Sequence, residues 1–328
     1  MKKGFTLIEL VMVIVILGII SMFGADLYSQ IYKSYLHTRA LNQLESRTQN
    51  AITLITNRLE YRVPGTTIGR IDGQPINQFL ELPSTTSAHN ILEWIGQSIE
   101  TKDINNQRPG WSGFVDVQSI PTPWAAGNNN INSQGSNLTS VSGIISNLTC
   151  AARGCAAGRY NNFAVIFKSV ASDFYGGQIN TAFGYSGTNL AADRIFVADA
   201  TVNAGANETL TITNYPANAS GEREFSEQYY LVHSAYTIYP TGTANVNYGG
   251  QASQNFNLML AYNYRPWLGE TYNANNNVQN ALLAEDVFMF RLRDEAGSIA
   301  MKLCMRDNGR NFDPNQLDMV MCKSQVVY

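Results

Sequence analysis

The chain has 328 residues, of which 45% are hydrophobic and only 14% are charged, and its formal net charge is −3. This length suffices for one large domain or two small ones with a sizeable core. The sparse, slightly negative charge excludes long-range attraction to nucleic acid, which depends on clustered Lys and Arg. We therefore expect no nucleic-acid partner.

The N-terminus joins a short basic leader to a long apolar segment. Lys2 and Lys3 precede Gly4, and from Phe5 the apolar stretch covers about 21 residues, which as a helix would span a ~30 Å hydrocarbon layer. A secretory signal peptide would be shorter and would end in small residues. A plain membrane anchor explains the length and the cytoplasmic lysines. Neither explains Glu9, because a carboxylate inside an apolar segment is costly and is functional by default.

The order of these residues resembles the class III signal of type IV prepilins. That pattern is a basic leader ending in glycine, an aromatic residue next and a glutamate four residues later, here Gly4, Phe5 and Glu9. The resemblance covers roughly residues 1–25. It implies that an inner-membrane prepilin peptidase cuts between Gly4 and Phe5, and that the new amino group of Phe5 is N-methylated. It also implies that Glu9 pairs with the positive N-terminus of Phe5, usually in a neighbouring subunit, since a buried carboxylate needs a paired charge.

The helical pattern continues beyond the apolar segment in amphipathic form. Apolar residues recur at steps of three and four, with polar residues on the opposite face, until Val-Pro-Gly at 63–65 gives a stop signal. A coiled coil or linker helix would show the same periodicity, but a stop where a head should begin favours a pilin stalk. We predict one helix from about residue 5 to 62, with a membrane and filament-core part at 5–25 and a stalk at 26–62. The stalk's apolar face comprises Leu27, Ile31, Tyr35, Leu41, Leu44, Ala51, Ile52, Ile55 and Leu59.

The remaining residues, 63–328, are predicted to form a β-rich head after a leader peptide at 1–4. The first part of this head gives irregular signals, with one short helix expected at 89–100 and an exposed polar excursion at 121–146. Runs rich in β-branched and aromatic residues then indicate strands. These expected strands are 162–170, 193–202, 208–215, 228–239 and 255–264.

The clearest hairpin lies near the C-terminus. Phe288, Phe290 and Leu292 alternate with arginines, and after a turn at 296–298 a second strand alternates in the same way through Met301, Leu303 and Met305. Two-residue periodicity of this kind predicts a half-buried antiparallel pair. The fold class is therefore predicted to be α+β, with the long N-terminal helix packed on a mainly antiparallel sheet, as in pilins.

The four cysteines form two sequence-local pairs, Cys150 with Cys155 and Cys304 with Cys322. An even count in an exported chain suggests disulfides, for which three pairings are possible, and the local pairing closes the shortest loops. Zinc is less favoured because the spacings are wide and no histidine is near in sequence. A bond from Cys304 to Cys322 would close a turn-rich loop, which is similar to the C-terminal disulfide loop of many pilins.

No catalytic motif is present, so we expect that the protein is not an enzyme and needs no cofactor. One weak candidate for calcium lies in the C-terminal loop, where Asp307, Asp313 and Asp318 supply oxygen ligands, although the spacing does not fit an EF-hand.

The resemblance to prepilins implies a single-pass protein of the bacterial inner membrane with its head in the periplasm, which later joins a pilus or pseudopilus. Its expected partners are prepilin peptidase, other major and minor pilins or pseudopilins, and the inner-membrane assembly platform. The size of the head favours a minor pilin at or near the tip of a type IV pilus that helps to initiate assembly. The alternatives are a pseudopilin of type II secretion, loosely similar to the J-type, and a tip adhesin or DNA-uptake receptor.

Overall fold

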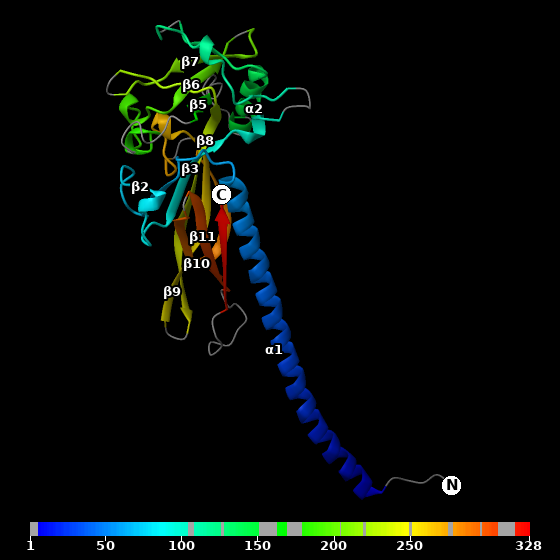
Figure 1. Cartoon of the computed structure of the whole chain (residues 1–328). Coiled ribbons are helices and arrows are strands. Elements are labelled where there is room, and N and C mark those ends of the chain that lie inside the picture. Colours follow the sequence, from blue (N-terminus) through cyan, green and yellow to red (C-terminus); the bar gives the residue numbers. More distant parts are fainter. Residues whose placement is uncertain are drawn as a thin grey trace.

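The long helix and a β-rich head are the two parts of the molecule in the computed structural model (Figure 1). The helix emerges from one end of the head, and its N-terminal part extends away from it. The structure describes residues 6–103, 108–125, 128–150, 163–168, 179–203, 205–218, 221–248, 251–274, 278–295, 297–307 and 319–328.

Helix α1 spans Leu7–Leu59 and confirms the predicted single helix, although it ends three residues earlier than the predicted limit at 62. It contains no proline, and Pro64 follows its end. The side chains that the head buries repeat at intervals of three and four, the period of one helix face. These residues are Leu44, Thr48, Ala51, Ile52, Ile55 and Leu59.

The head is organised around one sheet, and each strand pair in the described residues is antiparallel. The strand order is β12-β11-β10-β9-β8-β5-β6-β7-β4, and β3, β1 and β2 branch from β8. The strands are β1 (Ile68–Arg70), β2 (Leu80–Glu81), β3 (Ile91–Gln97), β4 (Asn130–Asn132), β5 (Phe163–Phe167), β6 (Ala198–Val202), β7 (Thr209–Asn214), β8 (Tyr229–Tyr248), β9 (Gln251–Tyr264), β10 (Gln279–Glu295), β11 (Ser298–Arg306) and β12 (Val320–Val327). The other helices are α2 (Leu138–Cys150) and the 3-10 turns η1 (Leu82–Ser84), η2 (Ile99–Thr101), η3 (Val117–Ser119), η4 (Ile179–Thr181), η5 (Ala191–Asp193) and η6 (Pro266–Leu268). The long helix on an antiparallel sheet confirms the predicted α+β class.

The core divides along the length of the head. Ile52, Ile55 and Leu59 of α1 pack with side chains of β10 and β11, including Phe290 and Leu303. At the end remote from the free part of α1, α2 packs with β5, β6 and β7 in a cluster that contains no α1 residue, which we call the distal lobe (Figure 1). A third cluster, which includes residues of β5, β8 and β9, completes the core.

The helix predicted at 89–100 is wrong, because these residues form strand β3. Six of its seven residues are buried, since β1 and β8 flank it and side chains cover both of its faces. Burial on both faces removes the alternation that normally marks a strand. A short apolar run of this kind does not distinguish a strand from a helix.

The exposed excursion predicted at 121–146 is also wrong. Helix α2 begins within it, and Leu138, Val141 and Ile145 are buried in the distal lobe. Ile131 of β4 is buried as well. The apolar residues are few but fall at intervals of three, four and seven, which places them on one helix face. The surrounding Asn, Ser and Gly obscured this pattern.

The strands expected in the second half are confirmed at β5, β7, β8 and β9, and β6 begins at Ala198 because η5 precedes it. The C-terminal hairpin is confirmed as β10 and β11, with one correction. The register shifts between Val287 and Met289, so that Phe288 is an extra residue on β10. Val287 therefore enters the core, while the Arg306 guanidinium lies 5.0 Å from the ring centroid of Phe288.

Candidate functional site: the N-terminal helix

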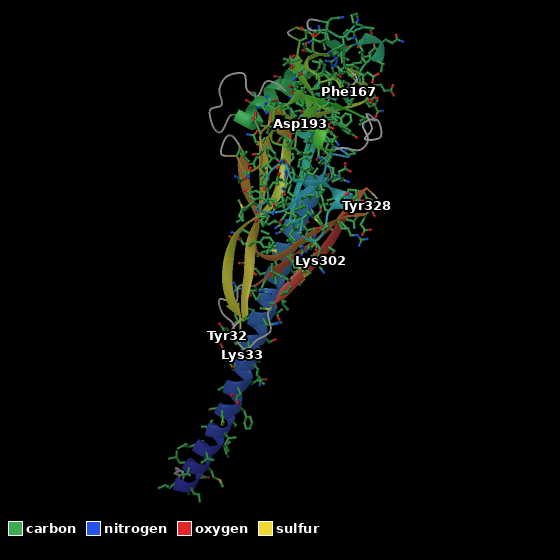
Figure 2. The ribbon with its side chains drawn as sticks, turned by 90° about the vertical axis from the view of Figure 1, so that its left-hand side faces the viewer. Tyr32, Lys33, Phe167, Asp193, Lys302 and Tyr328 are labelled. Carbon is green, nitrogen blue, oxygen red and sulfur yellow. A yellow bond between two sulfur atoms is a disulfide. The ribbon has the colours of Figure 1, made fainter. Side chains whose placement is uncertain are left out.

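The first part of α1 is an apolar cylinder that the head does not cover. Leu7, Ile16, Phe23 and Ile31 are all exposed, although they lie on different sides of the helix. Among the described residues α1 is long enough and apolar enough to cross a membrane. Tyr32 and Lys33 lie below the head, far from Phe167 and Asp193 of its distal part (Figure 2). A surface that is apolar all round needs lipid or other helices around it.

Glu9 lies in the first turn of this cylinder and is partly satisfied within its own helix. Its Oε2 accepts hydrogen bonds from the backbone N–H of Thr6 at 3.0 Å and from the Thr6 hydroxyl at 2.9 Å. These bonds use one of the backbone donors that a helix start leaves unpaired. No cation of the described residues forms an ion pair with Glu9, so its charge remains available to a partner. Gly4 and Phe5, the predicted processing residues, lie outside the described residues.

Comparison with protein families identifies this segment. A family model described as the prokaryotic N-terminal methylation motif matches residues 1–25. The N-terminus of the chain therefore carries the class III signal that is typical of type IV pilin-like prepilins. Searches of curated proteins and of solved structures give no match to the chain. The motif implies processing by prepilin peptidase and assembly with other pilins in the membrane.

The second part of α1 is fixed to the head by polar contacts that the sequence did not predict. Arg62, just after the helix, donates to the carbonyl oxygens of Leu59 and Tyr328, both at 3.1 Å, and to that of Gly297 at 3.2 Å. One guanidinium therefore joins the end of α1 to the C-terminal residue and to the β10–β11 turn. Tyr328 lies beside the head at the end of the C-terminal strand (Figure 2). No local pattern marks this role of Arg62, because its partners Tyr328 and Gly297 are more than 200 residues away in sequence.

The predicted disulfide between Cys304 and Cys322 is present. The two residues are direct partners across β11 and β12, with Cα atoms 4.1 Å apart. The bond therefore joins the edge strand β12 to β11, and both of these strands contact α1. Cys155 and the side chain of Cys150 lie outside the described residues, and their pairing stays a prediction.

The calcium candidate is not assembled in the described part of the chain. Asp307 follows β11 and donates its backbone N–H to the carbonyl of Met319 at 3.1 Å. Asp313 and Asp318 lie outside the described residues. Among the residues that the structure describes, no three His, Cys, Asp or Glu side chains are grouped to hold a metal ion. Calcium binding stays a prediction.

A buried polar cluster in the head joins three strands. Arg70 of β1 lies 2.6 Å from Glu93 of β3, and the Tyr264 hydroxyl of β9 donates to Glu93 at 2.8 Å. Burial raises the pKa of the Tyr264 hydroxyl, and the Glu93 carboxylate raises it further. Thr237 also contacts that hydroxyl. Because its members are enclosed and paired, the cluster fixes the packing of β1, β3 and β9.

Proposed function

We propose that this prepilin is a minor pilin that is incorporated at or near the tip of a type IV pilus and helps to initiate its assembly. The observation that supports the proposal is the contrast in width between α1 and the head. On incorporation α1 alone would enter the filament core, while the sheet, with twelve strands among the described residues, and its distal lobe would lie outside it. A head of this width would crowd a closely packed shaft, whereas the tip leaves one end free. The proposed role is structural, with no reaction and no cofactor assigned.

Glu9 is the proposed assembly residue. Before assembly, the Thr6 hydrogen bonds and the membrane interface hold its carboxylate. On incorporation it would pair with the methylated N-terminus of Phe5 in a neighbouring subunit. That attraction is strong in a medium of low dielectric constant, and the hydrogen bond between the two charged groups forms only at contact distance, so the pair favours one axial register between helices.

Two measurements test the proposal. Mass spectrometry of the membrane-derived protein should find a chain that begins at methylated Phe5, and sheared surface filaments should contain it in low amount. Retention of the leader in cells with active prepilin peptidase would contradict processing. Absence from filaments, together with a loss of type II secretion on gene deletion, would instead identify a pseudopilin.

Variants of Glu9 test the charge itself. Glu9→Val should leave processing largely intact and reduce incorporation into filaments strongly. Glu9→Gln retains an acceptor for the Thr6 N–H and removes only the charge, so it should fail in the same way. Asp26→Asn, which removes an acid from the same helix beyond the apolar segment, is the matched control and should assemble. Normal incorporation of Glu9→Val would refute the role assigned to Glu9.

The distal lobe favours a second role, contact with a surface or ligand by the pilus tip. Its core is separate from the α1 contacts and lies at the end of the head farthest from the membrane segment. The expected result is that protein in sheared filaments binds cells or glycans, and that deleting this gene while retaining piliation abolishes the binding. Unchanged binding by such filaments would assign the lobe to assembly alone.

A further inference from the structure

The part of α1 between the apolar segment and the head, residues 26–38, has two unlike sides. An α-helix turns by about 100° per residue, so Tyr28, Tyr32 and Tyr35, which follow at steps of four and three, share one side. Each of these three residues is more than half exposed. The rings of Tyr28 and Tyr32 stack with their centroids 6.4 Å apart. We call this side the tyrosine face.

The opposite side of the same segment is polar. Its two charged residues, Asp26 and Lys33, lie there with His37, and all three are exposed. Relative to Ile55, which the head buries, these positions are turned by no more than about 40°, whereas the tyrosines are turned by about 140–180°. The charged side is therefore in line with the face that carries the head, and the tyrosine face is opposite to it.

This arrangement divides the single apolar face that the sequence predicts for the stalk. Tyr35 and Leu44 belong to that predicted face, but the nine residues between them make about two and a half turns, so they point in opposite directions. The head buries Leu44 and leaves Tyr35 exposed. The tyrosine face is thus a second surface of the stalk, and a partner other than the head is needed to cover it.

The tyrosine face begins where the hydrocarbon layer of a membrane would end. Twenty residues separate Thr6 from Asp26. They rise about 30 Å, which is the thickness of the hydrocarbon core of a bilayer. Tyr28 and Tyr32 lie about 3 Å and 9 Å further along the axis, and the interfacial layer on each side of the core is about 5–8 Å thick. Both rings therefore reach the layer in which tyrosine is enriched.

Tilt of the helix toward the tyrosine face would improve this fit. Transmembrane helices tilt by about 20° on average, and interfacial aromatic and charged residues set the direction. In an upright helix Tyr35 would lie about 13 Å beyond Asp26, outside the interfacial layer. Tilt toward the tyrosine face lowers its ring toward that layer, and it raises Asp26 and Lys33 into water. Tilt in the opposite direction would bury the charges and expose the rings.

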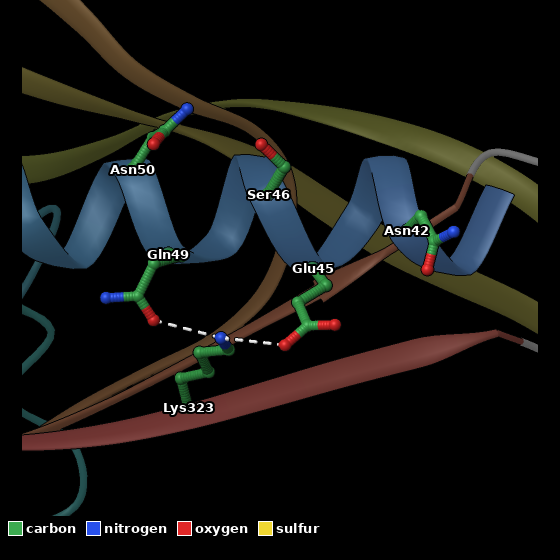
Figure 3. A pocket seen from close by; sticks show the side chains of 6 residues that line it. All are labelled: Asn42, Glu45, Ser46, Gln49, Asn50 and Lys323. Atoms are coloured by element: carbon green, nitrogen blue, oxygen red, sulfur yellow. Dashed lines mark hydrogen bonds and ion pairs between the residues drawn. The ribbon is translucent and has the colours of Figure 1, made fainter. Parts of the chain in front are cut away.

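The direction of tilt is passed to the head, because the head holds α1 on two flanks. Lys323 of β12 places its Nζ 3.2 Å from Glu45 Oε1 and 2.9 Å from Gln49 Oε1 (Figure 3). On the other flank, Arg47 pairs with Glu285 of β10 at 2.9 Å. Together with the buried helix face between them, these contacts fix the orientation of the head about the helix axis.

We propose that the tyrosine face binds the phospholipid headgroup layer on the head's side of the membrane before assembly, and tilts α1 so that the head-bearing side is turned away from the membrane. This contact belongs to the membrane-inserted subunit that the N-terminal motif implies, and it does not depend on the position of the subunit in a filament. Lipid is favoured over a second helix because the tyrosines directly follow the membrane-crossing segment, at headgroup depth.

The experiment compares Tyr32 with Gln30 and Ser34, which lie on the opposite side of the helix, about 3 Å below and about 3 Å above it along the axis. Full-length protein carries 5-hydroxytryptophan, which is excited selectively over the four native tryptophans, at one of these positions. It is reconstituted at low protein density in vesicles of phosphatidylethanolamine and phosphatidylglycerol with lipids brominated near the headgroup.

The order of quenching reports the direction of tilt. In a helix tilted toward the tyrosine face, the probe at Tyr32 should be quenched more strongly than the probes at both other positions. An upright helix would give Tyr32 an intermediate value, and tilt in the opposite direction would give it the weakest quenching. Either of these two results would overturn the proposal. A tyrosine face that contacts only other helices would also leave Tyr32 without the strongest quenching at low protein density.

Two variants separate the tyrosines from the rest of the helix. Tyr28→Ser with Tyr35→Ser should reduce quenching at position 32 to a value between those at positions 30 and 34. Tyr28→Trp with Tyr35→Trp is the matched control and should retain the strongest quenching at position 32, because tryptophan also prefers the interfacial layer. Unchanged quenching in the serine variant would assign the tilt to other residues and refute the role of the tyrosine face.

A probe at Val15, near the middle of the apolar segment, distinguishes failure of tilt from failure of insertion. Lipids brominated deep in the acyl chains should quench it. Quenching at Val15 without the strongest quenching at Tyr32 would overturn only the tilt. If the probe at Val15 is not quenched, α1 does not insert, and the proposed assembly from the membrane fails together with the tilt.

Discussion

The two parts of helix α1 differ in what surrounds them, although they form one continuous element. From Leu7 to Tyr35 apolar side chains lie exposed on every side, whereas from Leu44 to Leu59 a single face is buried by the head. The helix satisfies its own backbone hydrogen bonds in both environments, which is the requirement for crossing a membrane. The distribution of apolar residues around the helix therefore decides whether it contacts the protein's own sheet or other molecules.

The largest expected effect on stability comes from truncating a buried side chain of α1, with an exposed side chain of the same helix as the comparison. Ile55 is 1% exposed and Ile16 is 54% exposed. Ile55→Ala should lower the free energy of unfolding of the head by about 2–5 kcal/mol, because it removes buried contacts and leaves a cavity. Ile16→Ala should leave it unchanged within about 0.5 kcal/mol. Urea unfolding of the detergent-solubilised full chain, followed by tryptophan fluorescence, measures both.

In filament assembly, the larger effect of the two substitutions should come from Ile16→Ala. We expect Ile16→Ala to weaken incorporation into filaments without a change in head stability. If both variants destabilise the head equally, the first part of α1 packs on the head in solution, and the contrast between the two parts is wrong.

A second prediction concerns the strand beneath the buried part of α1. The double variant Cys304→Ser, Cys322→Ser should lower the free energy of unfolding by roughly 3 kcal/mol, because the open loop gains conformational freedom in the unfolded state. The matched control is the variant Cys150→Ser, Cys155→Ser, in which dithiothreitol can reduce only the Cys304–Cys322 bond, and its free energy of unfolding should fall by the same amount on reduction. A loss only in the Cys304→Ser, Cys322→Ser variant would mean that the substitutions, and not the missing bond, destabilise β12.

Much of the fold could be predicted because its signals are local in sequence. The helix 7–59, the β10–β11 hairpin and the Cys304–Cys322 pair each follow from residues close together in the chain. Strand β3 and helix α2 could not be predicted in this way. The burial of β3 depends on strands such as β8, its hydrogen-bonded neighbour, that are distant in sequence. The helical period of α2 is short and is surrounded by polar residues, and its burial depends on β5, β6 and β7. The bulge at Phe288 likewise depends on the register with β11.

The residues of the candidate site fall into the same two groups, those with a local sequence signal and those without one. The signal containing Glu9 is contiguous, and its pattern alone identified it. Arg62 and Lys323 act on residues at the other end of the chain, and their roles depend on how β12 and the β10–β11 turn meet α1. The position of β12 at one end of the sheet is also visible only once the strand order is known, because sequence alone does not show which strand is last.

The smallest expected effect on stability comes from a histidine near the place where the end of α1 meets the head. His233 of β8 is buried, and its Nδ1 lies 2.9 Å from the Ser98 hydroxyl. Arg58 of α1 pairs with Glu100 of η2 at 3.1 Å nearby. Burial lowers the pKa of His233, as do Arg58 and Arg265, while Glu100 opposes them.

The pH dependence of stability follows from that depressed pKa. When the pH falls below the ordinary histidine pKa of about 6.5, the unfolded chain binds a proton at His233 that the folded head does not, so the free energy of unfolding decreases. The decrease continues until the pH reaches the lower pKa of the folded state. His233→Asn retains a polar partner for Ser98 and has no titrating group, so the difference in stability between pH 7 and pH 5 should be smaller in this variant. Urea unfolding at the two pH values measures it, and an equal difference in both proteins would show that His233 is charged in the folded head or that carboxylates alone control its acid sensitivity.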